Sequence, residues 1–199
     1  SHGTFNQFGT LSGSQGGFNY LFAIGHYRSE HTPVTPPDLV PPGRRINPNF
    51  YDNLSFTTKL GYDFNEYFSL NYMRRIIDSR LLYTGDSGWP YLPNEFRSQQ
   101  NDLFHFHRGE AVVNLLDGRF RNVFGVGYAN LDTTNQSPPT LLGTPFPTHY
   151  IGIRTKYDYR GEFKVMDGHT LVFGVERSDE SLNDKTLRAS NGNTGGYLQ

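Results

Sequence analysis

The chain has 199 residues, of which 35% are hydrophobic and 15% aromatic, with a formal net charge of −1 and no cysteine. A near-neutral charge without runs of Lys or Arg argues against nucleic-acid binding, and the absence of cysteine excludes disulfides, thiolate metal sites and a cysteine nucleophile. No stretch approaches the roughly 18 consecutive apolar residues of a transmembrane helix. The length permits one large all-β domain.

Proline marks the layout of the chain. All twelve prolines lie in three segments, 33–48, 90–93 and 138–147. Because proline cannot donate to a sheet ladder, the runs between these segments are free to form central strands. We expect an antiparallel meander of about eight strands, longer than the usual five to six or so residues, over residues 4–11, 18–29, 53–64, 67–80, 102–116, 119–132, 150–165 and 169–181.

Alternation gives these runs two faces. In residues 54–64, large apolar side chains such as Phe56 and Leu60 alternate with small or polar ones such as Lys59 and Gly61, the period of an extended strand. A soluble sheet turns the apolar face toward a core, whereas a membrane barrel turns it toward lipid. Alternation alone leaves both arrangements open.

Two later strands differ in regularity. Residues 150–165 place apolar side chains on one face and six charges on the other, a face that would be solvated in either arrangement: Arg154, Lys156, Asp158, Arg160, Glu162 and Lys164. In residues 102–116, Phe104 and Phe106 have one parity, whereas Ala111, Val113 and Leu115 have the other. We therefore expect a β-bulge near Arg108 and Gly109.

The connections alternate in length. Short turns are expected at 12–17, 65–66, 117–118 and 166–168, and long loops at 30–52, 81–101 and 133–149, with a fourth long loop beginning near 182. Tight turns at one end and long loops at the other are typical of outer-membrane barrels. The fold class that this rhythm favours is therefore a transmembrane β-barrel.

Three stretches resemble consecutive barrel hairpins of a TonB-dependent outer-membrane receptor: GTFNQFGTLSGSQGGFNYLFAIGHYRSEHT, KLGYDFNEYFSLNYMRRIIDSRL and HTLVFGVERSDES. The resemblance implies that residues 1–199 form about strands two to nine of such a barrel, with the start of strand ten at 196–199 and without the plug domain. Within the family, the spacing is most similar to cobalamin-receptor-like members.

The resemblance also implies a location and partners. The full-length protein would lie in the outer membrane of a Gram-negative bacterium and take up a scarce nutrient, cobalamin or a ferric siderophore. Its partners would be outer-membrane lipid, the nutrient, its own plug domain and TonB. An isolated segment would leave two strand edges open and could self-associate.

The side chains that could catalyse a reaction or bind a metal do not form a recognisable catalytic pattern. No nucleophile turn brings Ser, His and Asp together, so we expect no enzyme activity and no cofactor. His105 and His107 share a strand face but lack a third metal ligand. Asp179, Glu180 and Asp184 have the oxygen ligands that calcium favours, although an ordinary acidic loop explains them as well.

Ligand binding is expected on the long loops, because aromatic and Arg side chains supply contact area and anion recognition. The candidates are Arg44, Arg45 and Tyr51 in the first long loop and Trp89, Tyr91, Phe96 and Arg97 in the second.

Two alternatives remain open at the level of sequence. One is a complete, small, eight-stranded outer-membrane barrel with a structural or adhesive role, and the other is a soluble ligand-binding β-barrel.

Overall fold

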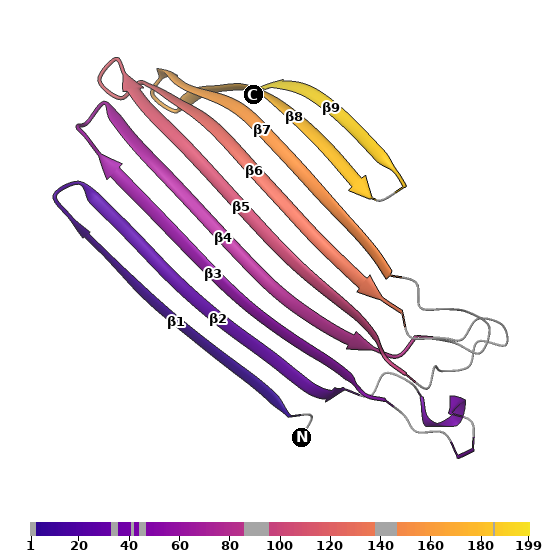
Figure 1. Cartoon of the computed structure of the whole chain (residues 1–199). Coiled ribbons are helices and arrows are strands. Elements are labelled where there is room, and N and C mark those ends of the chain that lie inside the picture. Colours follow the sequence, from indigo (N-terminus) through magenta and orange to yellow (C-terminus); the bar gives the residue numbers. More distant parts are fainter. Residues whose placement is uncertain are drawn as a thin grey trace.

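The chain folds as one nine-stranded antiparallel sheet in which every strand pairs with its neighbour in sequence (Figure 1). The computed structural model describes residues 3–32, 36–40, 42–43, 47–85, 96–137, 147–184 and 186–199. A short 3-10 helix, η1 (Pro37–Leu39), lies between the second and third strands. The strands are β1 (Thr4–Gln15), β2 (Phe18–Thr32), β3 (Asn49–Asp63), β4 (Phe68–Tyr83), β5 (Ser98–Leu115), β6 (Phe120–Gln136), β7 (Pro147–Met166), β8 (His169–Asp184) and β9 (Arg188–Leu198).

The predicted all-β meander is confirmed, with strands that extend further than the sequence pattern indicates. Most of the added residues lie at the ends that lead to the longer connections, where alternation is weak because both faces are polar. The fourth long loop, expected from 182, is wrong, because β8 continues to Asp184 and β9 begins at Arg188. The backbone N–H of Asp184 donates to the carbonyl of Leu187 across this tight turn.

The short connections owe their geometry to a few turn residues. Gly16 and Gly17 join β1 to β2 with φ of 57° and 83°, the left-handed values that a two-residue hairpin of the primed type requires. The Asn65 side chain accepts from the backbone N–H groups of Tyr67 and Phe68, both at 2.9 Å, and so closes the β3–β4 turn. The predicted short turns therefore lie together at one end of the sheet, which we call the turn end; the opposite end is the loop end.

The bulge predicted near Arg108 and Gly109 is absent, because β5 pairs with both neighbours in unbroken register at these residues. Phe104 and Phe106 instead lie on the opposite face from Ala111. The two parities therefore belong to a regular strand whose apolar residues change face along its length.

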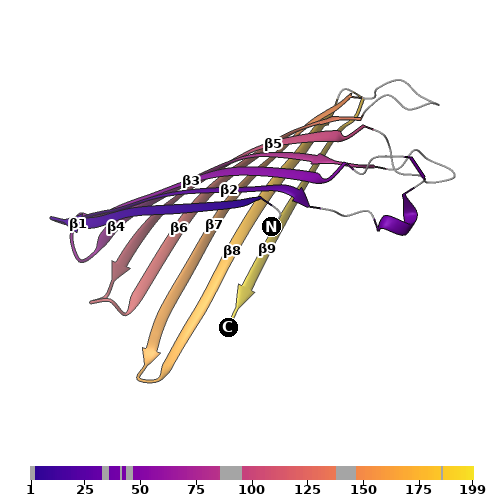
Figure 2. The ribbon, with the colours of Figure 1, turned by 90° about the horizontal axis from the view of Figure 1, so that it is seen from below.

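The sheet is open and has almost no core of its own. Figure 2 shows that the strand direction rotates progressively from β1 to β9, the twist expected of an antiparallel sheet. In the described part of the chain, the only buried apolar side chains are Val112 and Val123, and no helix there is long and apolar enough to cross a membrane. A single sheet must cover its apolar face with something else.

Candidate functional site

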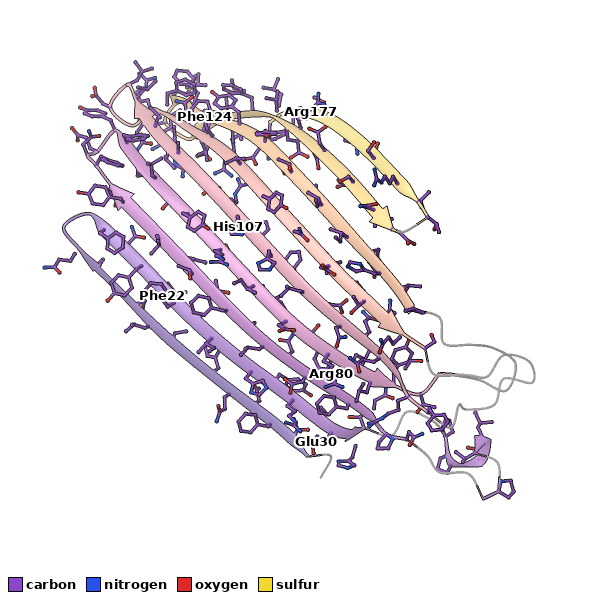
Figure 3. All side chains as sticks on the ribbon, in the orientation of Figure 1. Phe22, Glu30, Arg80, His107, Phe124 and Arg177 are labelled. Carbon is purple, nitrogen blue, oxygen red and sulfur yellow. The ribbon has the colours of Figure 1, made fainter. Side chains whose placement is uncertain are left out.

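One face of the sheet, which we call the apolar face, carries a belt of large side chains at the turn end. Residues that pair directly across neighbouring strands share a face, and the register from β2 to β8 therefore places every second residue of each strand on this one. Figure 3 shows Phe124 near the turn end, Phe22 and His107 level with each other in the middle of the sheet, and Arg80 toward the loop end. The apolar belt consists of Phe18, Tyr20, Phe22, Ile24, Leu60, Tyr62, Phe68, Leu70, Tyr72, Ala111, Val113, Leu115, Phe120, Phe124, Val126, Tyr128, Tyr157, Tyr159, Phe163, Leu171, Phe173 and Val175.

The apolar belt is exposed. Phe124 is 50% and Val175 is 57% exposed, and the belt holds no charged side chain. Its one inward-packed polar group, Asn122, is satisfied: it accepts from the Tyr159 hydroxyl at 2.7 Å and donates to the Val113 carbonyl at 3.3 Å. Such a contiguous exposed apolar surface needs an apolar environment.

The belt is oblique to the strands at its turn end. The first hairpin ends at Phe18, which pairs with Tyr62, and the second continues two residues beyond Tyr62, to Phe64, whose backbone N–H bonds to the Phe68 carbonyl. Val113 pairs with Phe68, and the third hairpin continues two residues beyond Val113, to Leu115. The turn end is therefore staggered by two residues per hairpin, or one per strand.

The loop-side border of the belt is less regular. The first polar residue beyond the belt is His26 on β2 and Arg177 on β8, and Arg177 aligns through the register with Tyr20, six residues before His26. Between these two strands the border is nearly level, because Thr58, Arg74, His107 and Thr155 all align with Phe22. The steady shift of about one residue per strand therefore belongs to the turn-side border. A rise of about 3.3 Å against a strand spacing of about 4.8 Å corresponds to a tilt of roughly 35°, which lies at the lower end of the 35–45° or so of membrane barrels.

The belt approaches the height of a membrane where it is tallest. On β6 it extends from Phe120 to Tyr128, about 26 Å along the strand and roughly 22 Å after correction for the tilt, close to the apolar band of about 25 Å in membrane barrels; on β4 it extends only from Phe68 to Tyr72. Strands β3 to β8 are 15 to 20 residues long, whereas about 9–11 residues suffice to span a bilayer. The additional strand residues lie at the loop end. There the apolar face also carries polar side chains, such as those of Asp52 and Asp132.

The opposite face, which we call the polar face, carries a ladder of ion pairs from β5 to β8. Arg108 on β5 donates to both carboxylate oxygens of Asp158 on β7 at 2.9 Å and to Glu110 at 2.8 Å. Lys156 donates to Glu176 on β8 at 2.6 Å. All six charges predicted to share a face of β7 belong to this face, so that prediction is confirmed.

Two glycines of β6 let the ladder cross that strand. Gly127 pairs with Arg108 and Lys156, and Gly125 pairs with Asp158 on the same face. A Cβ at position 125 would lie 2.5 Å from Asp158 Oδ2 and 2.6 Å from Arg108 Nη2. Glycine at 125 is therefore what leaves room for the bidentate pair, a role that the sequence pattern alone did not indicate.

The polar face also has an apolar hollow toward the loop end. Its volume is about 390 Å³, and Phe104, Leu131 and Leu182 line it, with Arg154 and Glu180 at its edge. Arg154 Nε forms an ion pair with Glu180 Oε1 at 3.1 Å and donates to the Ser178 hydroxyl at 2.9 Å. Phe104, one of the side chains that suggested a bulge, is thus part of an apolar patch within a charged surface.

The predicted ligand residues fall into three groups. Arg44, Arg45, Trp89 and Tyr91 lie outside the described residues. Tyr51 was expected in a loop, which is wrong, because it lies within β3, on the polar face, with its ring 6.1 Å from that of Tyr27; the preceding loop is shorter than the sequence suggested. Phe96 is 57% exposed, and Arg97 donates to the Pro48 carbonyl at 3.3 Å.

Hydrogen bonds hold the bases of the first two long loops together. Thr84, just after β4, donates its hydroxyl to the Asn47 carbonyl at 2.8 Å, and Arg97, just before β5, bonds to Pro48. The two loops predicted to bind ligand therefore leave the sheet side by side at the loop end (Figure 1).

The possible metal ligands do not converge. His107 accepts or donates at Nδ1 to the Tyr72 hydroxyl at 2.8 Å. Asp179 lies on the apolar face and Glu180 on the polar face, where each pairs with an arginine, Arg177 and Arg154. Within the described ranges, no group of three or more His, Cys, Asp or Glu side chains could hold a metal ion.

Comparison with known proteins adds no family. No protein-family model matches the chain, and no curated protein matches it in sequence. The resemblance to TonB-dependent receptors therefore stays a prediction.

Proposed function

We propose that the chain is part of the wall of an outer-membrane barrel, and that the full-length protein is a TonB-dependent receptor for a scarce nutrient, cobalamin or a ferric siderophore. The observation that carries the membrane part is the exposed apolar belt, whose turn-side border shifts by about one residue per strand. A bilayer is a slab bounded by two parallel planes, so strands that cross it at a tilt enter it at successively shifted positions.

The two faces of the sheet would meet different environments in this barrel. The apolar face contacts lipid, and the polar face, with its ion-pair ladder from Arg108 to Glu176, faces a hydrated lumen. The strand excess and the paired loop bases project outside the cell, where cargo is first met. The nutrient itself rests on the sequence resemblance, and binding residues are often found on loops held by a rigid scaffold.

An open sheet favours a segment over a complete small barrel. In the described residues, β1 pairs only with β2 and β9 only with β8. Full closure would pair the first and last strands and so remove both edges.

The absence of cysteine permits a direct test by labelling. In the full-length protein in outer membranes, we expect Phe124→Cys and Tyr157→Cys to react with a lipophilic maleimide and to resist a charged one. Lys156→Cys and Glu176→Cys should react with the charged reagent. Equal labelling of both pairs by the charged reagent would overturn the assignment of faces.

Transport is tested separately. A strain that lacks the full-length protein should lose growth on limiting cobalamin or on one ferric siderophore. Unchanged growth on all of these nutrients would overturn the receptor function while leaving the membrane assignment intact.

A further inference from the structure

An open groove lies within the apolar belt, above β5. Its volume is about 580 Å³, within the range of roughly 300–1,000 Å³ that is usual for small-molecule sites. The groove exists because β5 has small residues where both neighbouring strands have large ones. Its floor is Gly109 and Ala111, and its walls are Leu70 and Tyr72 of β4 and Phe124 and Val126 of β6.

The backbone conformation at position 109 does not require a glycine. Gly109 does not have a positive φ, and a Cβ there would meet only Val126 Cγ1, at 3.6 Å, an ordinary contact. Glycine inside a strand weakens it, and one of its usual purposes is to admit a ligand close to the backbone.

Polar groups close the loop-side end of the groove. The Tyr72 hydroxyl bonds to His107 Nδ1 at 2.8 Å, and the His107 ring lies 6.3 Å from that of Tyr128. Arg74 pairs with His107 in the register and shares the apolar face with it. None of the ion pairs among the described residues includes Arg74, so a cation without an acidic partner lies where the belt meets the polar part of the strands.

We propose that this groove binds a membrane lipid with a phosphate headgroup: one acyl chain lies over Gly109 and Ala111, and the phosphate pairs with Arg74 next to His107. The site rests on the proposed membrane location, since it needs the apolar face to meet lipid. Arginine recognises phosphate through charge-assisted hydrogen bonds, and a tyrosine at this depth is typical of a membrane interface.

The site can be tested with the full-length protein in detergent, by native mass spectrometry and titration with phosphatidylglycerol or with diacylglycerol of the same chains. Arg74→Gln is expected to weaken phosphatidylglycerol binding about tenfold, the loss of a charge-assisted contact, and to leave diacylglycerol binding unchanged. Ala111→Leu, which fills the groove, should weaken binding of both lipids.

Matched controls come from the polar face. Arg75→Gln removes the same charge one residue away, and Ala23→Leu adds the same bulk on that face of β2; both should bind lipid as the unaltered protein does. Equal lipid binding by Arg74→Gln and Arg75→Gln would overturn the phosphate contact, and unchanged binding in Ala111→Leu would overturn the groove. Failure of the unaltered protein to enter lipid vesicles would overturn the membrane proposal together with this one.

Discussion

The ion pair between Arg108 and Asp158 crosses β6 above Gly125, so adding one methyl group at that position should destabilise the protein. In Gly125→Ala the new Cβ would lie 2.5 Å from Asp158 Oδ2 and 2.6 Å from Arg108 Nη2, distances that force the carboxylate and the guanidinium apart. The side chains of Arg108 and Asp158 are 27% and 18% exposed, so solvent only partly replaces the lost bonds. A charge-assisted hydrogen bond contributes about 1.5–3 kcal/mol, and partial exposure reduces this; we expect a loss of about 2 kcal/mol.

The same strand supplies the control. A Cβ at Gly127, two residues away on the same face, would meet nothing closer than 3.9 Å. Gly127→Ala should therefore be neutral or stabilise by up to about 1 kcal/mol, because alanine restricts the unfolded chain. The measurement is the free energy of unfolding in urea of the full-length protein inserted in lipid vesicles.

A third variant separates the ion pair from general crowding. In an Asp158→Ala background the pair no longer exists, and the cost of Gly125→Ala should fall below about 0.5 kcal/mol, because only the flexible end of Arg108 remains near. An undiminished cost in that background, or equal costs for the two glycines, would refute the reasoning.

Three further predictions concern the two faces and the two ends. Tyr159→Asp should weaken membrane insertion by about 2 kcal/mol or more because it puts a charge in the apolar belt, whereas Arg160→Leu on the polar face should leave insertion largely intact; equal effects in a folding titration with vesicles would count against the faces. Asn65→Ala removes the acceptor of two turn hydrogen bonds and should destabilise the barrel by about 1 kcal/mol without changing nutrient affinity, a separation that fails if affinity also falls. Deletion of 33–48, or Trp89→Ala with Tyr91→Ala, should weaken nutrient binding by detergent-solubilised receptor while the barrel stays folded; unchanged affinity in both would place recognition elsewhere.

The turn end of the sheet could be predicted from sequence because its signals are local. Gly16 and Gly17, Asn65 and the Asp117–Gly118 pair each specify a tight turn by their own conformational preferences. The faces of β7 followed equally, since a period of two needs no knowledge of the neighbouring strands. The order of the strands then required only that consecutive runs pair.

The loop end could not be read in the same way. Residues 188–194 carry no large apolar side chain, so their alternation vanishes and β9 resembled a loop. Phe104 and Phe106 suggested a bulge because a single strand does not reveal that Leu131 and Leu182 lie on the same face. Gly125 had no local signal at all, because its importance comes from residues 17 and 33 positions away that meet above it.

The charge on the polar face bears on the width of the barrel that we propose. At a tilt of about 35°, each strand occupies roughly 6 Å of circumference, so nine strands would enclose a ring only about 17 Å across between backbones. A barrel of eight or so strands is filled by its own side chains and leaves no room for water. The ladder from Arg108 to Glu176 would then be compressed and dehydrated, at a cost of several kcal/mol for each ion left without ideal partners. In the proposed barrel, the charges on the polar face would therefore require a gentler curvature than nine strands alone can give, and the edges of β1 and β9, unpaired among the described residues, would be where further strands join.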